Sequence, residues 1–271
     1  MVRADTVTFG YDTTEVLRGV SLSVASGGLT GVLGPNGSGK TTLLRLLGGL
    51  HRPSTGRVTL HGQDVSTYPR SLLARRMAVV PQETHMAFDY SVLEVVLMGR
   101  YPHLGRFAIE GPADLAYAEH ALRATGTEGL KARSFMTLSG GEKQRVVIAS
   151  ALAQLSASNG TTAGAQVLLL DEPTASLDLA YQLEIAALIC QLNARGITVV
   201  ISTHDLNLAA SVCRDLVLLR EGCVLAAGPT NDVLTAATVR ALYGVDAQVT
   251  HHAAAGHMLV VPVAQTNDST R

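Results

Sequence analysis

The sequence predicts an α/β fold, a doubly wound parallel sheet with an N-terminal antiparallel β subdomain and an inserted α-helical lobe. Three observations predict it. Apolar runs of strand length alternate with helical segments between Val167 and Leu219. A glycine-rich turn, Gly34–Gly39, joins an apolar run to a helical one. Helical periodicity dominates the stretch from about Glu83 to Ala157, which lies between these two regions.

Short β-rich runs open the chain. Thr6–Tyr11 and Val20–Val24 are predicted strands, because β-branched and aromatic residues recur in them and a polar bend separates them. Leu29–Leu33 has the apolar character of a buried strand. Lys40–Leu47 is predicted to form a helix that starts directly after glycine.

The middle of the chain is predicted to change from strands to helices. Pro53–Gly56 predicts a turn, and Arg57–Gln63 and Ala78–Pro81 predict short strands. Val92–Gly99 and Ala113–Thr125 then have the spacing of amphipathic helices. These helices would form the inserted lobe.

Alternating strands and helices return at Val167. The predicted elements are a strand at Val167–Asp171, a helix at Ala180–Ala194, a strand at Ile197–Ser202, a helix at Asp205–Ser211 and a strand at Leu216–Leu219. Short loops join them, as is typical of a parallel sheet.

We expect one α/β domain over residues 1–228, with the helical lobe at about 83–157, and a C-terminal extension over residues 229–271. The extension contains one predicted helix and a predicted strand at Met258–Val263, and its polar end, Gln265–Arg271, is expected to fray. Ser156–Ala165 consists of small and polar residues and is predicted to be a loop.

Composition excludes several classes of protein. Hydrophobic residues make up 47% of the 271 residues and charged residues 16%, which excludes a disordered chain. The formal net charge of -1 gives no reason to expect nucleic acid as a partner. The three cysteines form no CxxC pair, and no apolar run has the length of a membrane span. The first residues also lack the apolar core of a signal peptide, so we expect a cytoplasmic protein.

The strongest motif is a P-loop of the form GxxxxGK[ST]. It consists of Gly34, Pro35, Asn36, Gly37, Ser38, Gly39, Lys40, Thr41 and Thr42. The glycines let the backbone curl around a phosphate, and the N–H groups at the start of the following helix favour negative charge. Lys40 is expected to bind the outer phosphates and Thr41 to hold Mg²⁺.

A pair of carboxylates ends the predicted strand at Val167–Asp171. Asp171 would stand at the edge of the sheet beside the P-loop, where it can hold Mg²⁺. The side chain of the next residue, Glu172, points in a different direction from that of Asp171 and can reach an attacking water.

A second glycine-rich helix start, Leu138–Arg145, contains Ser139, Gly140 and Gly141. With the P-loop and the carboxylate pair, this segment resembles the signature of the ATP-binding-cassette (ABC) ATPases, which have a P-loop NTPase (RecA-like) fold. In that family the signature faces the ATP held by a second subunit. The resemblance extends from about Val2 to Gly228.

Four other positions resemble family positions that surround the nucleotide. Tyr11 resembles the aromatic residue that stacks on adenine, and Gln82 the glutamine that contacts Mg²⁺. Asp178 resembles the aspartate of the loop that crosses the dimer interface. His204 resembles the histidine that contacts the γ-phosphate.

The resemblance implies an ATPase that uses ATP and Mg²⁺, with Glu172, His204, Gln82 and Lys40 in catalysis. It implies a homodimer of ATPase subunits, two integral-membrane permease subunits and, indirectly, a periplasmic or surface substrate-binding protein. The expected location is the cytoplasmic face of the inner membrane. The alternatives are a non-transport ABC ATPase, a P-loop kinase of small molecules and a scaffolding protein.

Three further segments resemble importers of iron–siderophore complexes, haem and cobalamin. They are Met98–Gly105, Leu177–Gln182 and the tail from Leu242–Asp246 to Leu259–Pro262. The Ser156–Ala165 loop is similar to an insertion in haem importers, so haem or a ferric siderophore is the expected cargo and cobalamin the alternative. One departure is Ser150, where relatives usually carry arginine. The histidines at 251, 252 and 257 are predicted to be solvated and not to bind a metal.

Overall fold

The computed structural model describes residues 1–84, 86–156 and 166–265, so most of the Ser156–Ala165 loop and the end of the tail lie outside it. It divides the chain into two compact units, residues 1–66 with 200–271 and residues 67–199. The predicted division at residue 228 stays a prediction.

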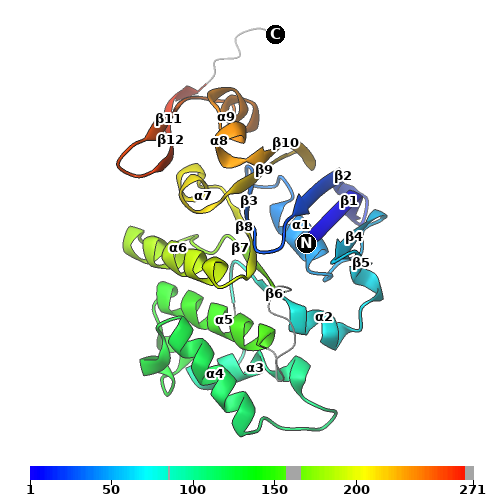
Figure 1. Cartoon of the computed structure of the whole chain (residues 1–271), viewed down its shortest axis with the longest axis vertical. Helices are drawn as coiled ribbons and strands as arrows, with labels where there is room; N and C mark the ends of the chain where they lie inside the picture. Colours follow the sequence, from blue (N-terminus) through cyan, green and yellow to red (C-terminus); the bar gives the residue numbers. More distant parts are fainter. Residues whose placement is uncertain (85, 157–165, 266–271) are drawn as a thin grey trace. The chain divides into compact units, whose positions relative to one another are not determined.

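The predicted antiparallel β subdomain is confirmed within the first unit. Strands β1 (Val2–Tyr11), β2 (Thr14–Val24), β4 (Thr55–Leu60) and β5 (Gln63–Asp64) form a sheet in the order β2-β1-β4-β5 (Figure 1). The single strand expected at Arg57–Gln63 is wrong. A turn at His61 and Gly62, both with positive φ, ends β4 and starts β5.

A mixed six-stranded sheet carries the P-loop and the carboxylate pair. Its strand order is β10-β9-β3-β8-β7-β6. The six strands are β3 (Leu29–Leu33), β6 (Met77–Val80), β7 (Val167–Asp171), β8 (Thr198–Thr203), β9 (Asp215–Arg220) and β10 (Cys223–Pro229). β3 pairs with β9 and β6 with β7 in parallel, whereas β9 and β10 form an antiparallel hairpin. β3 and β7 are buried along their whole length, as their apolar sequences predict.

The rest of the first unit consists of helices and a second hairpin. The helices are α1 (Lys40–Leu47), α7 (Leu206–Val212), α8 (Thr230–Val233) and α9 (Ala236–Tyr243), and the hairpin is β11 (Val245–His252) with β12 (His257–Gln265). Asn207 on α7 connects this helix to β12 of the hairpin through two hydrogen bonds. Its Oδ1 accepts from the N–H of Val260 at 2.8 Å, and its Nδ2 donates to the carbonyl of the same residue at 3.2 Å.

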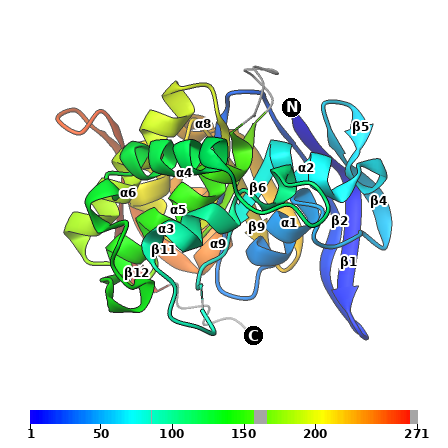
Figure 2. The same ribbon diagram turned by 90° about the horizontal axis from the view of Figure 1, so that it is seen from below.

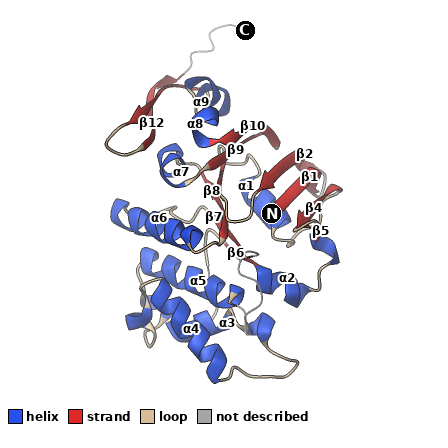
Figure 3. Ribbon diagram, in the orientation of Figure 1, coloured by secondary structure: helices blue, strands red, loops and turns tan. Residues whose placement is uncertain are grey.

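Helices dominate the second unit (Figure 3), and three of them lie within the stretch predicted to be helical, 83–157. The helices are α2 (Arg70–Arg76), α3 (Val92–Met98), α4 (Pro112–Ala124), α5 (Gly140–Leu155) and α6 (Leu179–Ala194). α5 packs against α3 and α4. The contact with α3 is close, because a Cβ on Gly99 would lie 2.2 Å from the carbonyl oxygen of Ser150.

The segment Met98–Gly105 closes the end of α5. Arg100 is fully buried, and its guanidinium donates to Asp114 at 3.0 Å and to the carbonyls of Ala153 and Ser156 at 2.6 and 2.8 Å. These carbonyls at the end of a helix need donors from outside the helix. Ser150 has its own bond, because its Oγ donates to the carbonyl of Val95 at 3.0 Å.

Candidate nucleotide-binding site

The P-loop runs from the end of β3 into the start of α1, as the sequence predicts. A Cβ on Gly34 would lie 2.2 Å from the carbonyl oxygen of Leu219, and Gly39 has a φ of 103° that other residues rarely adopt. A side chain at Gly34 would force the backbone to move, and one at Gly39 would be strained by the positive φ. The two glycines therefore fix the course of the loop.

Lys40 lies at the centre of this loop. Its side chain is buried, and Nζ donates to the carbonyls of Gly34 at 2.8 Å and Pro35 at 3.2 Å. A buried ammonium is costly unless such partners surround it. The loop therefore wraps around a fixed positive charge at the first residue of α1.

The start of α1 is suited to an anion. Gly39 occupies the N-cap position and provides no side-chain acceptor, and the first turn contains no acidic residue. Ser38 is buried, and its Oγ has no hydrogen-bond partner within the described part of the chain. Amide donors at a helix start, a buried ammonium and an unpaired hydroxyl together fit the oxygens of a phosphate. Thr41 and Thr42 follow on the same helix.

Two other predicted residues belong to the first unit. Tyr11 ends β1, and 40% of its surface is exposed. His204 follows β8 and is exposed, and its carbonyl accepts from the hydroxyl of Tyr243 at 3.3 Å. Asp205 caps α7 through its side chain, so His204 stands between a strand end and a helix start.

The carboxylate pair belongs to the second unit. Asp171 is the last residue of β7 and is buried, as predicted. Glu172 follows with a φ of 45°, a left-handed conformation that costs energy for a residue other than glycine. Strain of this kind clusters at functional sites. Gln82 lies two residues beyond β6 and is exposed.

The signature segment forms the start of α5, which begins at Gly140. Ser139 is the N-cap residue, and its Oγ accepts from the N–H of Glu142 at 3.3 Å. The Glu142 carboxylate accepts from the N–H of Ser139 at 2.8 Å, and this bond holds the pKa of Glu142 below its usual value.

Leu177–Gln182 lies against the two signature glycines. A Cβ on Gly140 would meet Leu177 at 3.3 Å, and one on Gly141 would lie 2.2 Å from the Tyr181 ring. Asp178 caps α6, accepting from the N–H of Tyr181 at 3.0 Å. The sequence marks this segment only by its resemblance to importers, and no motif in it predicts that Tyr181 packs on Gly141.

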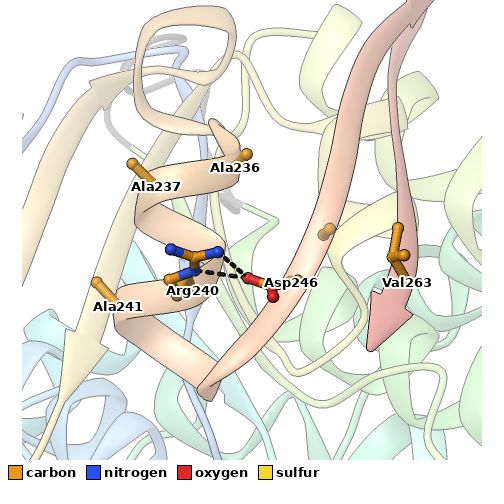
Figure 4. A pocket seen from close by; sticks show the side chains of 7 residues that line it. Ala236, Ala237, Arg240, Ala241, Asp246 and Val263 are labelled. Atoms are coloured by element: carbon orange, nitrogen blue, oxygen red, sulfur yellow. Dashed lines mark hydrogen bonds and ion pairs between the residues drawn. The ribbon is translucent and has the colours of Figure 1, made fainter. Parts of the chain in front are cut away.

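The predicted residues thus fall into two groups. Tyr11, the P-loop and His204 belong to the first unit, and Gln82, the signature, Asp171, Glu172 and Asp178 belong to the second. None of them lines the hollow between α9, β11 and β12 in Figure 4, where Arg240 Nε donates to Asp246 at 2.6 Å.

Comparison with known proteins points to one family. The sequence profile of the ABC transporter family matches residues 17–175. The hemin import ATP-binding protein HmuV of Myxococcus xanthus is 44% identical over 246 residues, which cover 90% of this chain and 90% of HmuV. The ferric enterobactin transport ATP-binding protein FepC of Escherichia coli is 36% identical over 270 residues, 99% of this chain and 96% of FepC.

A third relative is longer than this chain. The cobalamin import ATP-binding protein BtuD of Halobacterium salinarum is 41% identical over 251 residues, or 92% of this chain. The chain spans only 60% of the length of that relative.

Solved structures confirm the P-loop NTPase fold. A metal-chelate type ABC transporter in an inward-facing conformation has a TM-score of 0.80 and 32% identity, covering 97% of this chain and 96% of that one. The dimeric post-hydrolysis state of a cassette with ADP and Pi, MJ0796, has a TM-score of 0.71 and 28% identity, covering 85% of this chain and 99% of that one. No helix in the described ranges is long and apolar enough to cross a membrane.

Proposed function

Because the chain belongs to the ABC transporter family, we propose that it is the ATP-binding and ATP-hydrolysing subunit of an importer. The P-loop carries this proposal. Its buried Lys40 binds two loop carbonyls at the start of a helix whose N-cap residue offers no side-chain acceptor. The ammonium and the amide N–H groups are complementary to the negative charge of a nucleoside triphosphate.

Each predicted residue has a role in this proposal. Lys40 and the P-loop amides bind the phosphates, and Tyr11 stacks on the adenine. Thr41, Gln82 and Asp171 would hold Mg²⁺, which when bound neutralises charge on the phosphate oxygens. Glu172 accepts a hydrogen bond from the attacking water, and His204 contacts the γ-phosphate. Catalysis then rests on positioning and charge stabilisation.

We propose that a second copy of the chain completes the site. Ser139, Gly140 and Gly141 begin a helix of their own, and Ser139 is exposed. The amide N–H groups at the start of this helix also favour a phosphate, although, unlike at α1, Ser139 and Glu142 cap this helix start. ATP would then hold two subunits together head to tail, and its hydrolysis would release them. Asp178 of each subunit would lie at this interface.

The proposed membrane partner is a pair of permease subunits, which would place the chain at the cytoplasmic face of the inner membrane. The second unit supports this with large exposed apolar side chains between residues 88 and 109, namely Phe88, Tyr101, Phe107 and Ile109. Large exposed apolar side chains mark a protein interface when they gather on one face, and these four lie within a stretch of about twenty residues.

We propose an iron complex, haem or a ferric siderophore, as the cargo, with cobalamin as the second candidate. The relatives named for hemin and ferric enterobactin support the first, and the BtuD relative supports the second. A substrate-binding protein would deliver the cargo to the permease. Uptake assays with haem, a ferric siderophore and cobalamin distinguish the three cargoes.

Glu172→Gln tests the hydrolytic role. The amide keeps the shape of the side chain and removes the charge that activates water. We expect this variant to bind ATP and to form stable dimers, while phosphate release falls by a factor of about 100 or more. Phosphate release and dimer formation by gel filtration with ATP are the measurements.

Glu221→Gln is the matched control. Glu221 is also a glutamate with positive φ, but its side chain is 76% exposed in the turn between β9 and β10. It should hydrolyse ATP at the parent rate. Normal turnover by Glu172→Gln would contradict the role of Glu172.

A further inference from the structure

Three aromatic rings meet at one end of β1. Phe9 and His51 stack with their ring centres 5.0 Å apart and an interplanar angle of 16°. Tyr11 stands edge-on to both, at 89° to Phe9 and 85° to His51. The Tyr11 hydroxyl and His51 Nε2 are 3.1 Å apart, a hydrogen-bond distance.

This arrangement restricts the ring of Tyr11. Edge-to-face contacts with two parallel rings favour one ring orientation, and the bond to His51 fixes the hydroxyl end. Even so, 40% of Tyr11 remains exposed. The side chain is thus held in one orientation while much of its surface stays accessible, as a stacking platform requires.

His51 is joined to the P-loop through a single short helix. α1 begins at Lys40, and the N–H groups of Leu50 and His51 donate to the carbonyl of Arg45 in its last turn, at 2.9 and 3.3 Å. α1 also packs against β1, which carries Phe9 and Tyr11 (Figures 1 and 2). The start of α1 therefore lies at the proposed phosphate site, and the segment after its end contacts Tyr11.

We propose that His51 is a positioning residue, which holds the ring of Tyr11 in place for stacking on the base of the nucleotide. The inference rests on the proposed function, because it needs ATP to bind at the P-loop. His51 contacts Tyr11 and Phe9, and it lies beyond the end of α1 opposite to Lys40. Its contribution therefore concerns only ligands that carry a base.

The test compares ATP with inorganic tripolyphosphate, which has the phosphates and no base. Dissociation constants for both are measured by calorimetry with the full chain. For His51→Ala we expect ATP affinity to fall about three- to tenfold, the range for one lost hydrogen bond and one aromatic contact. Tripolyphosphate affinity should stay unchanged. His120→Ala, an exposed histidine on α4, is the control and should change neither.

Conservative variants separate the hydrogen bond from the ring. His51→Gln keeps a polar group near Tyr11 and should recover part of the loss. Tyr11→Phe keeps the stacking ring and loses the hydroxyl. If the hydrogen bond between Tyr11 and His51 positions the ring, His51→Phe and Tyr11→Phe should lower the affinity for ATP by the same factor. The double variant should then bind ATP no more weakly than either single variant.

Two results would overturn the inference. Unchanged ATP affinity in His51→Ala would show that Tyr11 needs no support. Equal losses for ATP and tripolyphosphate would show that His51 only stabilises the region around α1. Failure of the proposed function is distinguishable from both, because the parent chain would then bind neither ligand.

Discussion

The absence of one side chain sets the distance between two helices in the second unit. Gly99 follows α3, and a Cβ there would lie 2.2 Å from the carbonyl oxygen of Ser150 on α5. That atom belongs to the backbone and cannot rotate away. The next residue, Arg100, is fully buried against the end of α5, so this contact cannot loosen without moving Arg100.

We therefore expect Gly99→Ala to lower the free energy of unfolding by about 1–3 kcal/mol, the range for an overpacked interior. Urea denaturation followed by circular dichroism measures it. Gly129→Ala is the control, because nothing lies within 4 Å of the added Cβ and its φ is not positive. A stability loss below that of Gly129→Ala would contradict the close packing of α3 on α5.

At the scale of single residues, the sequence predicted the groups with a chemical pattern. The P-loop, Asp171 and Ser139 lie at a strand end or a helix start, where their motifs require them. His51 and Tyr181 could not be found this way. Their contacts join residues 40 positions or more apart in the chain, and no short motif contains both partners.

At the scale of elements, the start of α5 depends on a charged group. The Glu142 carboxylate accepts from the N–H of Ser139 and lies 3.8 Å from Arg133. Its pKa is lowered mainly by the Ser139 hydrogen bond. The folded pKa is therefore below the unfolded one. The stabilisation is complete above the unfolded pKa and is lost as the pH falls through the folded pKa.

Glu142→Gln keeps an acceptor at this position but cannot carry the charge. We expect it to be less stable than the parent by about 0.5–1 kcal/mol near neutral pH. The gap should stay constant from about pH 7 to about pH 5 and shrink as the pH falls further to about 3, because the carboxylate becomes protonated only below its ordinary pKa. Urea titrations of both proteins across this range measure the gap. A gap that stays constant down to about pH 3 would show that the charge of Glu142 does not stabilise α5.

Elements that the sequence missed lack a strong hydrophobic pattern of their own. α2 buries only Leu73 among seven residues, and β11 contains mostly polar or small side chains. β10 alternates exposed and half-buried positions. Each depends on a partner that follows or precedes it, as β11 depends on β12 and β10 on β9. Periodicity within a short window cannot report such pairing.

At the scale of the whole molecule, the proposed site draws on two copies of the chain. If the signature of one subunit closes over the P-loop of the other, each dimer has two equivalent sites. Substitutions of Lys40 and Ser139 then act on the same site when they are carried by different chains, and on different sites when one chain carries both. This geometry can be tested without a permease.

In a Glu172→Gln background, which we expect to retain ATP, neither Lys40→Ala nor Ser139→Arg alone should trap nucleotide. Mixing the two chains should restore one intact site in each mixed dimer, because the P-loop of the Ser139→Arg chain meets the unchanged signature of the Lys40→Ala chain. Tandem purification through two different tags isolates mixed dimers, and about one ATP per dimer is expected. A chain with both substitutions, mixed with the background chain, has no intact site and should yield none. The reverse result, with ATP in this control mixture and none in the first, would mean that each subunit completes its own site.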